Sequence, residues 1–294
     1  MRLRRVVIGG SAAAVGAAGL FSWFAGQQLT KRPEPDAYAN PARFDLPFEP
    51  VSFSSRDGVT LRGWFIPAED GRGTIVFCPG HTGSMHSDLG YVPWFHEAGY
   101  DLLMFDWRGR GRSDGAVTSL GILERRDLLG AIDFLQKRGV EQVGLMGFSM
   151  GGAVAMATSP MSEAVAAVVS DGAFTRVRDV VVSAMVRQRG MPPAIARLIS
   201  RPIIWAASLQ LGVDITLIDP IRWADFFRAP LLMIHGQQDP YVPPAAAYQL
   251  YHAAREPKEL WMVPEAGHRD IYQLRQEEYK ERVIGFFDRW LNGQ

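Results

Sequence analysis

The 294-residue chain contains a single cysteine, Cys78, so it cannot form an intrachain disulfide. Its 31 basic and 31 acidic residues cancel, and this balance gives no reason to expect a nucleic-acid partner. The sequence has no metal-ligand spacing of histidine and cysteine, no glycine-rich phosphate-binding loop and no internal repeat. We therefore predict a protein without a metal or another cofactor. Cys78 lies in an apolar run, where it is expected to pack in the core.

The N-terminus lacks charge over a long stretch, because Val6 to Gly26 follows the basic start of the chain without any charged residue. That run is about as long as the ~20 residues that cross a bilayer. It is rich in glycine and alanine, and its small-residue sites, Ala17–Gly19 and Ala25-Gly26, are not clean cleavage signals. We therefore expect residues 1–30 to be an uncleaved membrane anchor, with a cleaved signal peptide or a soluble tail as alternatives.

The placement of the charges also predicts an orientation. Arg2, Arg4 and Arg5 precede the apolar run, which favours an N-terminus on the cytoplasmic side and the remaining chain on the outer, extracytoplasmic face. Cleavage of a signal would instead give a secreted or periplasmic protein. Residues 31–50 contain five prolines and are predicted to form a linker.

Apolar strand-like runs alternate with helical patterns from residue 51 onward. A hairpin signal at Arg56-Asp57-Gly58 comes first, and the alternation then predicts a mostly parallel central sheet with helices on both faces, which is the α/β class. The predicted strands are Val51–Ser54, Val59–Ile66, Thr74–Cys78, Tyr100–Phe105, Gln142–Met146, Ala164–Val169, Leu231–Ile234 and Glu259–Val263. The helices include Ile122–Lys137 and Glu277–Leu291. We expect one domain over residues 51–294.

A G-x-S-x-G motif, Gly147-Phe148-Ser149-Met150-Gly151, lies between a predicted strand and a run of small, helix-forming residues. In that context the motif is typical of a nucleophile elbow, a sharp turn that lifts the serine hydroxyl above the sheet. Glycine on either side avoids collisions with the backbone and tolerates unusual dihedrals. Ser149 is therefore predicted to be a catalytic nucleophile, as opposed to part of a structural turn.

A serine hydroxyl needs a base to remove its proton and an acid to orient that base, and after an elbow they follow in the order acid, then histidine. Three histidines follow Ser149. His268 lies on a turn after a predicted strand, where open α/β sheets keep their sites, whereas His235 and His252 are predicted in a turn and a surface helix. We predict His268 as the base. Asp239 is the predicted acid, and its competitors are Asp171 and Asp270.

Attack on a carbonyl creates an oxyanion, which preorganised N–H groups stabilise. The backbone N–H of Met150, directly after the nucleophile, is one predicted donor. The second is expected in the loop Pro79-Gly80-His81-Thr82-Gly83, from the backbone N–H of His81 or, as runner-up, of Thr82. The side chain of His81 has two open interpretations, a pocket wall or a solvent-facing loop residue.

These motifs together resemble the α/β-hydrolase superfamily, and within it the BEM46-like and serine-aminopeptidase-like serine hydrolases. The resemblance covers about residues 50–291 and includes the elbow, Gly267-His268, His235-Gly236 with Asp239, and the segment Phe105–Asp114. Such proteins commonly carry His-Gly in the oxyanion loop, whereas this chain has Pro79-Gly80. Backbone amides supply the donors, so the departure concerns the geometry of the loop and not the donor role.

Residues 174–228 interrupt the alternation, at a point where α/β-hydrolases commonly insert a lid. The segments Ala194–Leu198 and Ile203–Leu209 are predicted helical. Six arginines and one acid, Asp179, lie between Phe174 and Arg201, which indicates either a solvated basic face or a rim that meets anionic head groups.

The resemblance and the triad order predict a serine hydrolase that cleaves small carboxylic esters, lipid-derived esters among them, through an acyl-enzyme intermediate. The triad chemistry serves amides equally, so a peptidase or amidase is the alternative. A hydrolase-like binding protein without turnover is an alternative of another class, and the intact order Ser149, Asp239, His268 argues against it.

Overall fold

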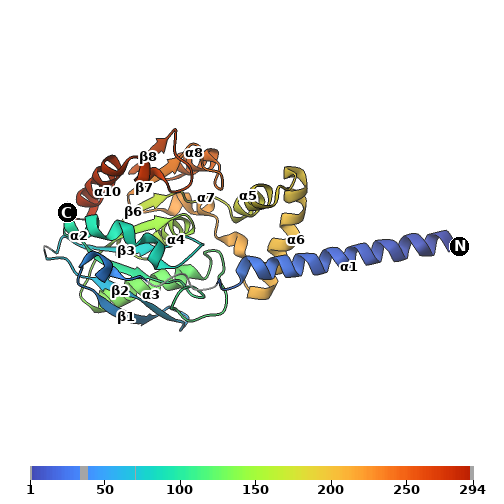
Figure 1. Cartoon of the computed structure of the whole chain (residues 1–294), viewed down its shortest axis with the longest axis horizontal. Coiled ribbons are helices and arrows are strands. Elements are labelled where there is room, and N and C mark those ends of the chain that lie inside the picture. The colour runs from blue at the N-terminus through green and yellow to red at the C-terminus, as the bar shows by residue number, and fades with distance from the viewer. Residues whose placement is uncertain (1, 34–38, 70, 292–294) are drawn as a thin grey trace.

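The computed structural model describes residues 2–33, 39–69 and 71–291, without the side chains of residues 2–15 and 188. An eight-stranded sheet in the order β1-β2-β4-β3-β5-β6-β7-β8 forms the centre of the body (Figure 1). β2 pairs antiparallel with β1 and β4, and the remaining pairs are parallel. The strands are β1 Glu49–Ser54, β2 Thr60–Ile66, β3 Thr74–Cys78, β4 Asp101–Phe105, β5 Val143–Phe148, β6 Val165–Asp171, β7 Leu231–Gly236 and β8 Lys258–Val263.

Helices occupy the connections between the strands. The α-helices are α1 Arg2–Thr30, α2 Val92–Glu97, α3 Glu124–Lys137, α4 Met150–Thr158, α5 Val177–Arg189, α6 Pro193–Leu211, α7 Pro220–Trp223, α8 Pro244–Ala253, α9 Ile271–Leu274 and α10 Gln276–Leu291. The 3₁₀ helices are η1 Pro41–Phe44, η2 Met85–Tyr91, η3 Ser159–Met161, η4 Ile215–Leu217 and η5 Ala224–Phe226. The predicted mostly parallel α/β sheet is thereby confirmed, and the strand boundaries differ from the predicted ones by a few residues.

The core has two halves because successive side chains of a strand point to opposite faces of the sheet. In β3, Val76 and Cys78 belong to the apolar cluster that includes side chains of α3, α4 and α8. Ile75 and Phe77 belong to the cluster with α2 and α10 on the other face. Cys78 is fully buried, as the prediction of a packing role required.

The insertion between β6 and β7 contains α5, α6, η4, α7 and η5. The sequence predicted two separate apolar segments here, and the structure joins them into the single helix α6 with Pro202 inside it. A proline inside a helix removes one backbone hydrogen bond, and its ring collides with the carbonyl four residues earlier, so the contacts of α6 with α1 and α5 must offset this cost. Figure 1 shows α5 and α6 on the side of the body from which α1 extends.

The N-terminal helix α1 packs along α6 with its second half. In the part of the chain that the structure describes, no helix is long and apolar enough to cross a membrane. The first ten residues of the predicted span Val6–Gly26 lie outside the residues whose side chains are described. The prediction of a membrane-spanning helix therefore has no support from the structure.

The predicted linker is partly folded. Residues 34–38 lie outside the described residues, whereas η1 and the start of β1 fall within the predicted linker range of 31–50. Phe44, Leu46 and Phe48 pack against the core cluster on the α2 and α10 face. The segment after residue 39 is therefore held to the domain by apolar contacts.

Candidate active site

Ser149 occupies the junction between β5 and α4, with φ 51° and ψ −112°. A positive φ is rare for a residue with a side chain and marks a strained turn. The flanking glycines make the turn sterically feasible. A Cβ on Gly151 would lie 1.8 Å from the carbonyl oxygen of Cys78, and one on Gly147 would lie 2.5 Å from Cα of Gly152. The predicted elbow is therefore present in the structure.

Ser149, His268 and Asp239 form one hydrogen-bonded chain. The Oγ of Ser149 lies 3.1 Å from Nε2 of His268, and Nδ1 of His268 lies 2.6 Å from Oδ2 of Asp239. With the proton of the neutral ring on Nδ1, His268 donates a hydrogen bond to Asp239 and accepts one from the hydroxyl of Ser149. The loops after β5, β7 and β8 carry these three side chains. We call these three loops the catalytic loops.

The carboxylate of Asp239 is held from its other side as well. Its Oδ1 accepts hydrogen bonds from the backbone N–H of Tyr241 at 2.7 Å and of Val242 at 2.8 Å. The side chain of Asp239 is fully buried. The loop after β7 thus fixes the carboxylate so that Oδ2 faces the imidazole.

The competing residues take other places. The ring of His235 is buried, and its Nε2 lies 3.0 Å from the carbonyl oxygen of Val242. His252 is exposed on α8. Asp171 accepts a hydrogen bond from the hydroxyl of Tyr279 with its carboxylate, while its carbonyl oxygen accepts from the N–H of Ser149. Asp270 is the residue that precedes α9. Neither His235 nor His252 contacts the hydroxyl of Ser149 in the described residues.

The predicted oxyanion loop passes over the nucleophile. A Cβ on Gly80 would lie 3.7 Å from Cβ of Ser149, which measures how closely the loop approaches the elbow. His81, Thr82, Ser149 and Met150 line the same cavity. Within the described residues, neither the N–H of His81 nor that of Met150 donates a hydrogen bond. Both predicted donor residues thus line the space beside the serine.

The side chain of His81 turns out to line the cavity. Burial lowers the pKa of His81 to about 3, and the neighbouring positive charge of Arg110 adds to this effect. The guanidinium of Arg110 donates to Nδ1 of His81 at 2.9 Å, which requires that nitrogen to be unprotonated. His81 is therefore a neutral ring at physiological pH.

Arg269 is a site residue that the sequence analysis missed. It directly follows His268, has φ 61°, and its guanidinium forms an ion pair with the fully buried carboxylate of Asp88 in η2. The guanidinium also lies over the ring of Phe148, 4.3 Å from its centre. Burial raises the pKa of Asp88, and the charge of Arg269 opposes that shift. Arg269 thus connects the His268 loop, the end of β5 and the segment that follows the oxyanion loop.

No local signal marked this pair in the sequence. An arginine next to a loop histidine is usually solvent-exposed, and its partner Asp88 is 181 residues away in the chain. The fold alone brings the two charges together.

The cavity beside Ser149 has a volume of about 450 Å³. Its walls are mostly apolar, and side chains of helix α5 form a large part of them (Val177, Val180, Val181 and Ala184). Leu120, Phe174 and Val242 add further apolar surface, and Gln28 and Leu29 reach the cavity from α1. Such a size and composition are typical of small-molecule sites.

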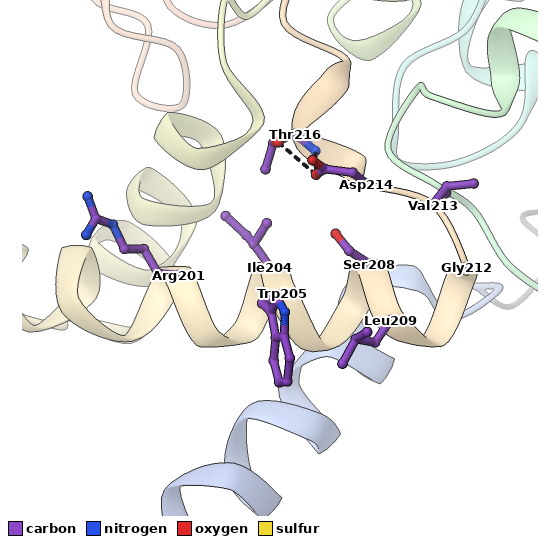
Figure 2. A pocket seen from close by; sticks show the side chains of 9 residues that line it. All are labelled: Arg201, Ile204, Trp205, Ser208, Leu209, Gly212, Val213, Asp214 and Thr216. Atoms are coloured by element: carbon purple, nitrogen blue, oxygen red, sulfur yellow. Dashed lines mark hydrogen bonds between the residues drawn. The ribbon is translucent and has the colours of Figure 1, made fainter.

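A second hollow, of about 620 Å³, lies between α6 and the segment that follows it (Figure 2). Trp205 and Arg201 line it from the helix, and Asp214 lines it from the other side, where its carboxylate accepts the hydroxyl hydrogen bond of Thr216 at 2.7 Å. No histidine in the described part of the chain lines it, so it holds no pair of hydroxyl and imidazole like that of Ser149 and His268. Across the described ranges, no group of three His, Cys, Asp or Glu side chains could hold a metal ion.

Known proteins resemble the chain in sequence. Residues 73–195 match a family model described as the alpha/beta hydrolase fold, and residues 207–294 match one described as PhoPQ-activated pathogenicity-related protein. The protein YfhR of Escherichia coli O157:H7 is 30% identical over 257 residues, which cover 84% of this chain and 82% of YfhR. The alpha/beta hydrolase domain-containing protein WAV2 of Arabidopsis thaliana is 28% identical over 269 residues, which cover 85% of this chain and 82% of WAV2.

Solved structures show the same fold. An esterase of Pyrococcus furiosus superposes with a TM-score of 0.76 at 23% identity and covers 88% of this chain and 97% of its own. An esterase of Exiguobacterium antarcticum superposes with a TM-score of 0.62 at 18% identity, over 81% and 99% of the two chains. With the fold, the elbow and these similarities in agreement, the chain belongs to the α/β-hydrolase family.

Proposed function

We propose that the protein is a serine hydrolase that cleaves carboxylic esters through an acyl-enzyme intermediate. The observation that carries the proposal is the hydrogen-bonded chain from Ser149 through His268 to Asp239 at a strained elbow. An apolar cavity lies directly beside the hydroxyl, which suits the acyl group of an ester. A hydroxyl, a base and an orienting carboxylate in this arrangement are the elements that acyl transfer requires.

The proposed reaction has two halves. His268 removes the proton of Ser149 as the hydroxyl oxygen attacks the ester carbonyl carbon, and the resulting oxyanion accepts hydrogen bonds from the N–H groups of Met150 and His81. When the tetrahedral intermediate collapses, His268 protonates the departing alcohol and Ser149 keeps the acyl group. Water, deprotonated by His268, then attacks the carbonyl carbon of the acyl-enzyme. When this second tetrahedral intermediate collapses, the bond between the acyl group and Oγ of Ser149 breaks, His268 returns the proton to Oγ, and the acid is released. One oxyanion donor lowers the barrier by about 3–4 kcal/mol in a comparable enzyme.

The lining of the cavity favours esters over the substrates of an aminopeptidase. An aminopeptidase must bind a positively charged amino terminus, for which an acidic side chain is the usual partner. Among the described residues that line the cavity there is no Asp or Glu, and the charged side chain present, Arg269, is positive. Peptidase activity therefore remains the second candidate, supported by the shared triad chemistry alone.

The test is a panel of nitrophenyl esters of increasing acyl length, run beside aminoacyl-amides on the purified full chain. We expect ester turnover, labelling by a fluorophosphonate, and loss of both in Ser149→Ala. Turnover of amides that exceeds that of esters would favour the peptidase. Absence of labelling and of any turnover in the folded protein would favour a binding protein that uses the same fold.

For localisation we propose association with a membrane through the N-terminal segment, with the catalytic domain on the extracytoplasmic side. The support is the charge-free run Val6–Gly26 behind basic residues, together with Leu20, Phe21 and Phe24, which are large, apolar and exposed on α1. Secretion after cleavage of a signal is the alternative. Cell fractionation with N-terminal sequencing tests both. A soluble protein with an intact N-terminus would contradict the proposal.

A further inference from the structure

The last turn of the N-terminal helix reaches the catalytic cavity. Gln28 and Leu29 of α1 line the same space as Ser149, His268 and the apolar side chains of α5. Leu29 is half-buried and packs against the core cluster, although 120 residues of chain separate it from the nucleophile in the numbering. The N-terminal helix therefore contributes a wall of the site and is more than an extension of the chain.

Contacts before Leu29 hold α1 against the lid. Gly26 lies so close to α6 that a Cβ there would be 2.8 Å from the backbone nitrogen of Ala207 and 3.2 Å from the carbonyl oxygen of Ile203. The side-chain amide of Gln210 donates to the carbonyl oxygen of Trp23 at 2.8 Å. A glycine is what permits two helices to approach with their backbones in contact.

Contacts after Leu29 hold the end of the helix to the catalytic domain. The carbonyl oxygen of Thr30 accepts a hydrogen bond from the N–H of Thr118 at 2.9 Å, and Lys31 forms a β-bridge with Val117. Two residues beyond Thr118 lies Leu120, which also lines the cavity. Leu29 is thus fixed between α6 on one side and the 117–120 loop on the other, so its side chain keeps a defined position in the wall.

We propose that Leu29 determines substrate specificity, because with the last turn of α1 it bounds the space for the acyl group and limits the length of chain that fits. This rests on the proposed ester hydrolase function. The neighbouring wall is apolar, built by Leu120, Val180 and Val181, so the group that meets Leu29 is an apolar acyl chain. An apolar wall excludes a longer acyl chain because the two would overlap. A side chain missing from the wall weakens the binding of an acyl chain that would otherwise contact it.

The experiment measures kcat/KM for nitrophenyl acetate, butyrate, octanoate and dodecanoate with the full chain. Leu29→Ala should raise the ratio of kcat/KM for the dodecanoate ester to kcat/KM for the butyrate ester by about tenfold, since one methylene in an apolar pocket changes the rate at least that much. Leu29→Trp should lower the ratio of octanoate to acetate by a similar factor. Gln27→Ala is the matched control, because Gln27 lies two residues before Leu29, is exposed and does not line the cavity.

A second variant tests the attachment of the helix. Gly26→Leu places a side chain where only backbone contact fits, so it should displace α1 from α6 and change the ester ratio in the same direction as Leu29→Ala. Thermal unfolding of each variant shows that the domain remains folded. The proposal is overturned if wild type, both Leu29 variants and Gly26→Leu share one chain-length profile. If folded wild type hydrolyses no ester and no fluorophosphonate labels it, the proposed function itself fails, which is a distinguishable result.

Discussion

The catalytic loops and the wall that α1 and α5 form border one cavity but are built by different means. In the catalytic loops, Ser149 is fixed by a strained backbone and Asp239 by two backbone N–H groups. The wall has apolar side chains toward the cavity, and α1 is held by the close approach of Gly26 to α6 and by hydrogen bonds to its backbone before and after Leu29. Hydrogen-bond geometry is intolerant of change, whereas an apolar wall changes shape without loss of the reacting groups. Substitutions should therefore stop the reaction in the first region and redirect it in the second.

The largest effect is expected at the nucleophile and its base. Ser149→Ala and His268→Ala should each lower kcat for ester hydrolysis by about 10⁶-fold, the loss seen when either residue is removed from a comparable triad. Alanine fits the elbow, so the fold should remain. His252→Ala, on the exposed face of α8, is the control and should keep its activity. Near wild-type turnover in Ser149→Ala would show that Ser149 is not the nucleophile.

The next effect concerns the acid. Asp239→Asn should keep the fold but lower kcat by about 10⁴-fold, because the amide no longer selects the tautomer of His268 with the proton on Nδ1. Asp171→Asn should cost far less, since the carboxylate of Asp171 binds Tyr279 and not the imidazole. Steady-state kinetics on nitrophenyl butyrate measure both. If Asp171→Asn proved the more damaging change, Asp239 would not be the orienting acid.

The ion pair of Arg269 and Asp88 should affect stability and activity together. Arg269→Met leaves the buried carboxylate of Asp88 without its partner, and breaking a buried pair costs about 3–5 kcal/mol of unfolding free energy. Kinetics should show a lower kcat with little change in KM, because the loops that Arg269 connects carry the reacting groups. Urea unfolding and ester kinetics are the measurements.

Three comparison variants separate a positioning role of Arg269 from simple loss of charge. Arg269→Met combined with Asp88→Leu should recover most of the stability but not the rate, while Arg269→Lys should recover part of both. Arg275→Met removes the exposed ion pair with Glu265 and should cost at most about 1 kcal/mol. Full recovery of the rate in the double variant would assign Arg269 a structural role alone.

Sequence reasoning reached the catalytic loops because their signals are local. Ser149 is marked by glycines within two residues, and His268 and Asp239 by turns directly after apolar strands. The wall has no such signal. Leu29 looks like the end of an apolar segment, and its contact with the cavity depends on how α1 meets α6, which is a long-range packing outcome. The same holds for Arg269, whose partner in η2 is distant in the chain. The positions of the three hydrogen-bonded side chains were therefore predictable from signals that lie within one turn each, and the contact of Leu29 with the cavity was not.

A pH dependence of stability is expected to arise at His81, a residue of the oxyanion loop. Its pKa in the folded protein is lowered to about 3 by burial and by Arg110, against 6.5 for the ordinary ring. Between these two values the unfolded chain binds a proton that the folded protein does not. The unfolding free energy should therefore fall as the pH drops from about 6.5 toward 3, at no more than about 1.4 kcal/mol per pH unit from this group.

Replacement of the ring isolates this contribution. In His81→Gln no proton is taken up at this position in either state, so the variant should lose less stability than wild type over the same pH range. Chemical unfolding at pH 7, 6, 5 and 4 gives the two curves, and His252→Gln, whose ring is exposed on α8, is the matched control. The carboxylates titrate in all three proteins, so only the difference between the curves is informative. Parallel curves for wild type and His81→Gln would mean that Arg110 and the cavity do not hold the ring neutral, and that the oxyanion loop is as adaptable as the α1 wall.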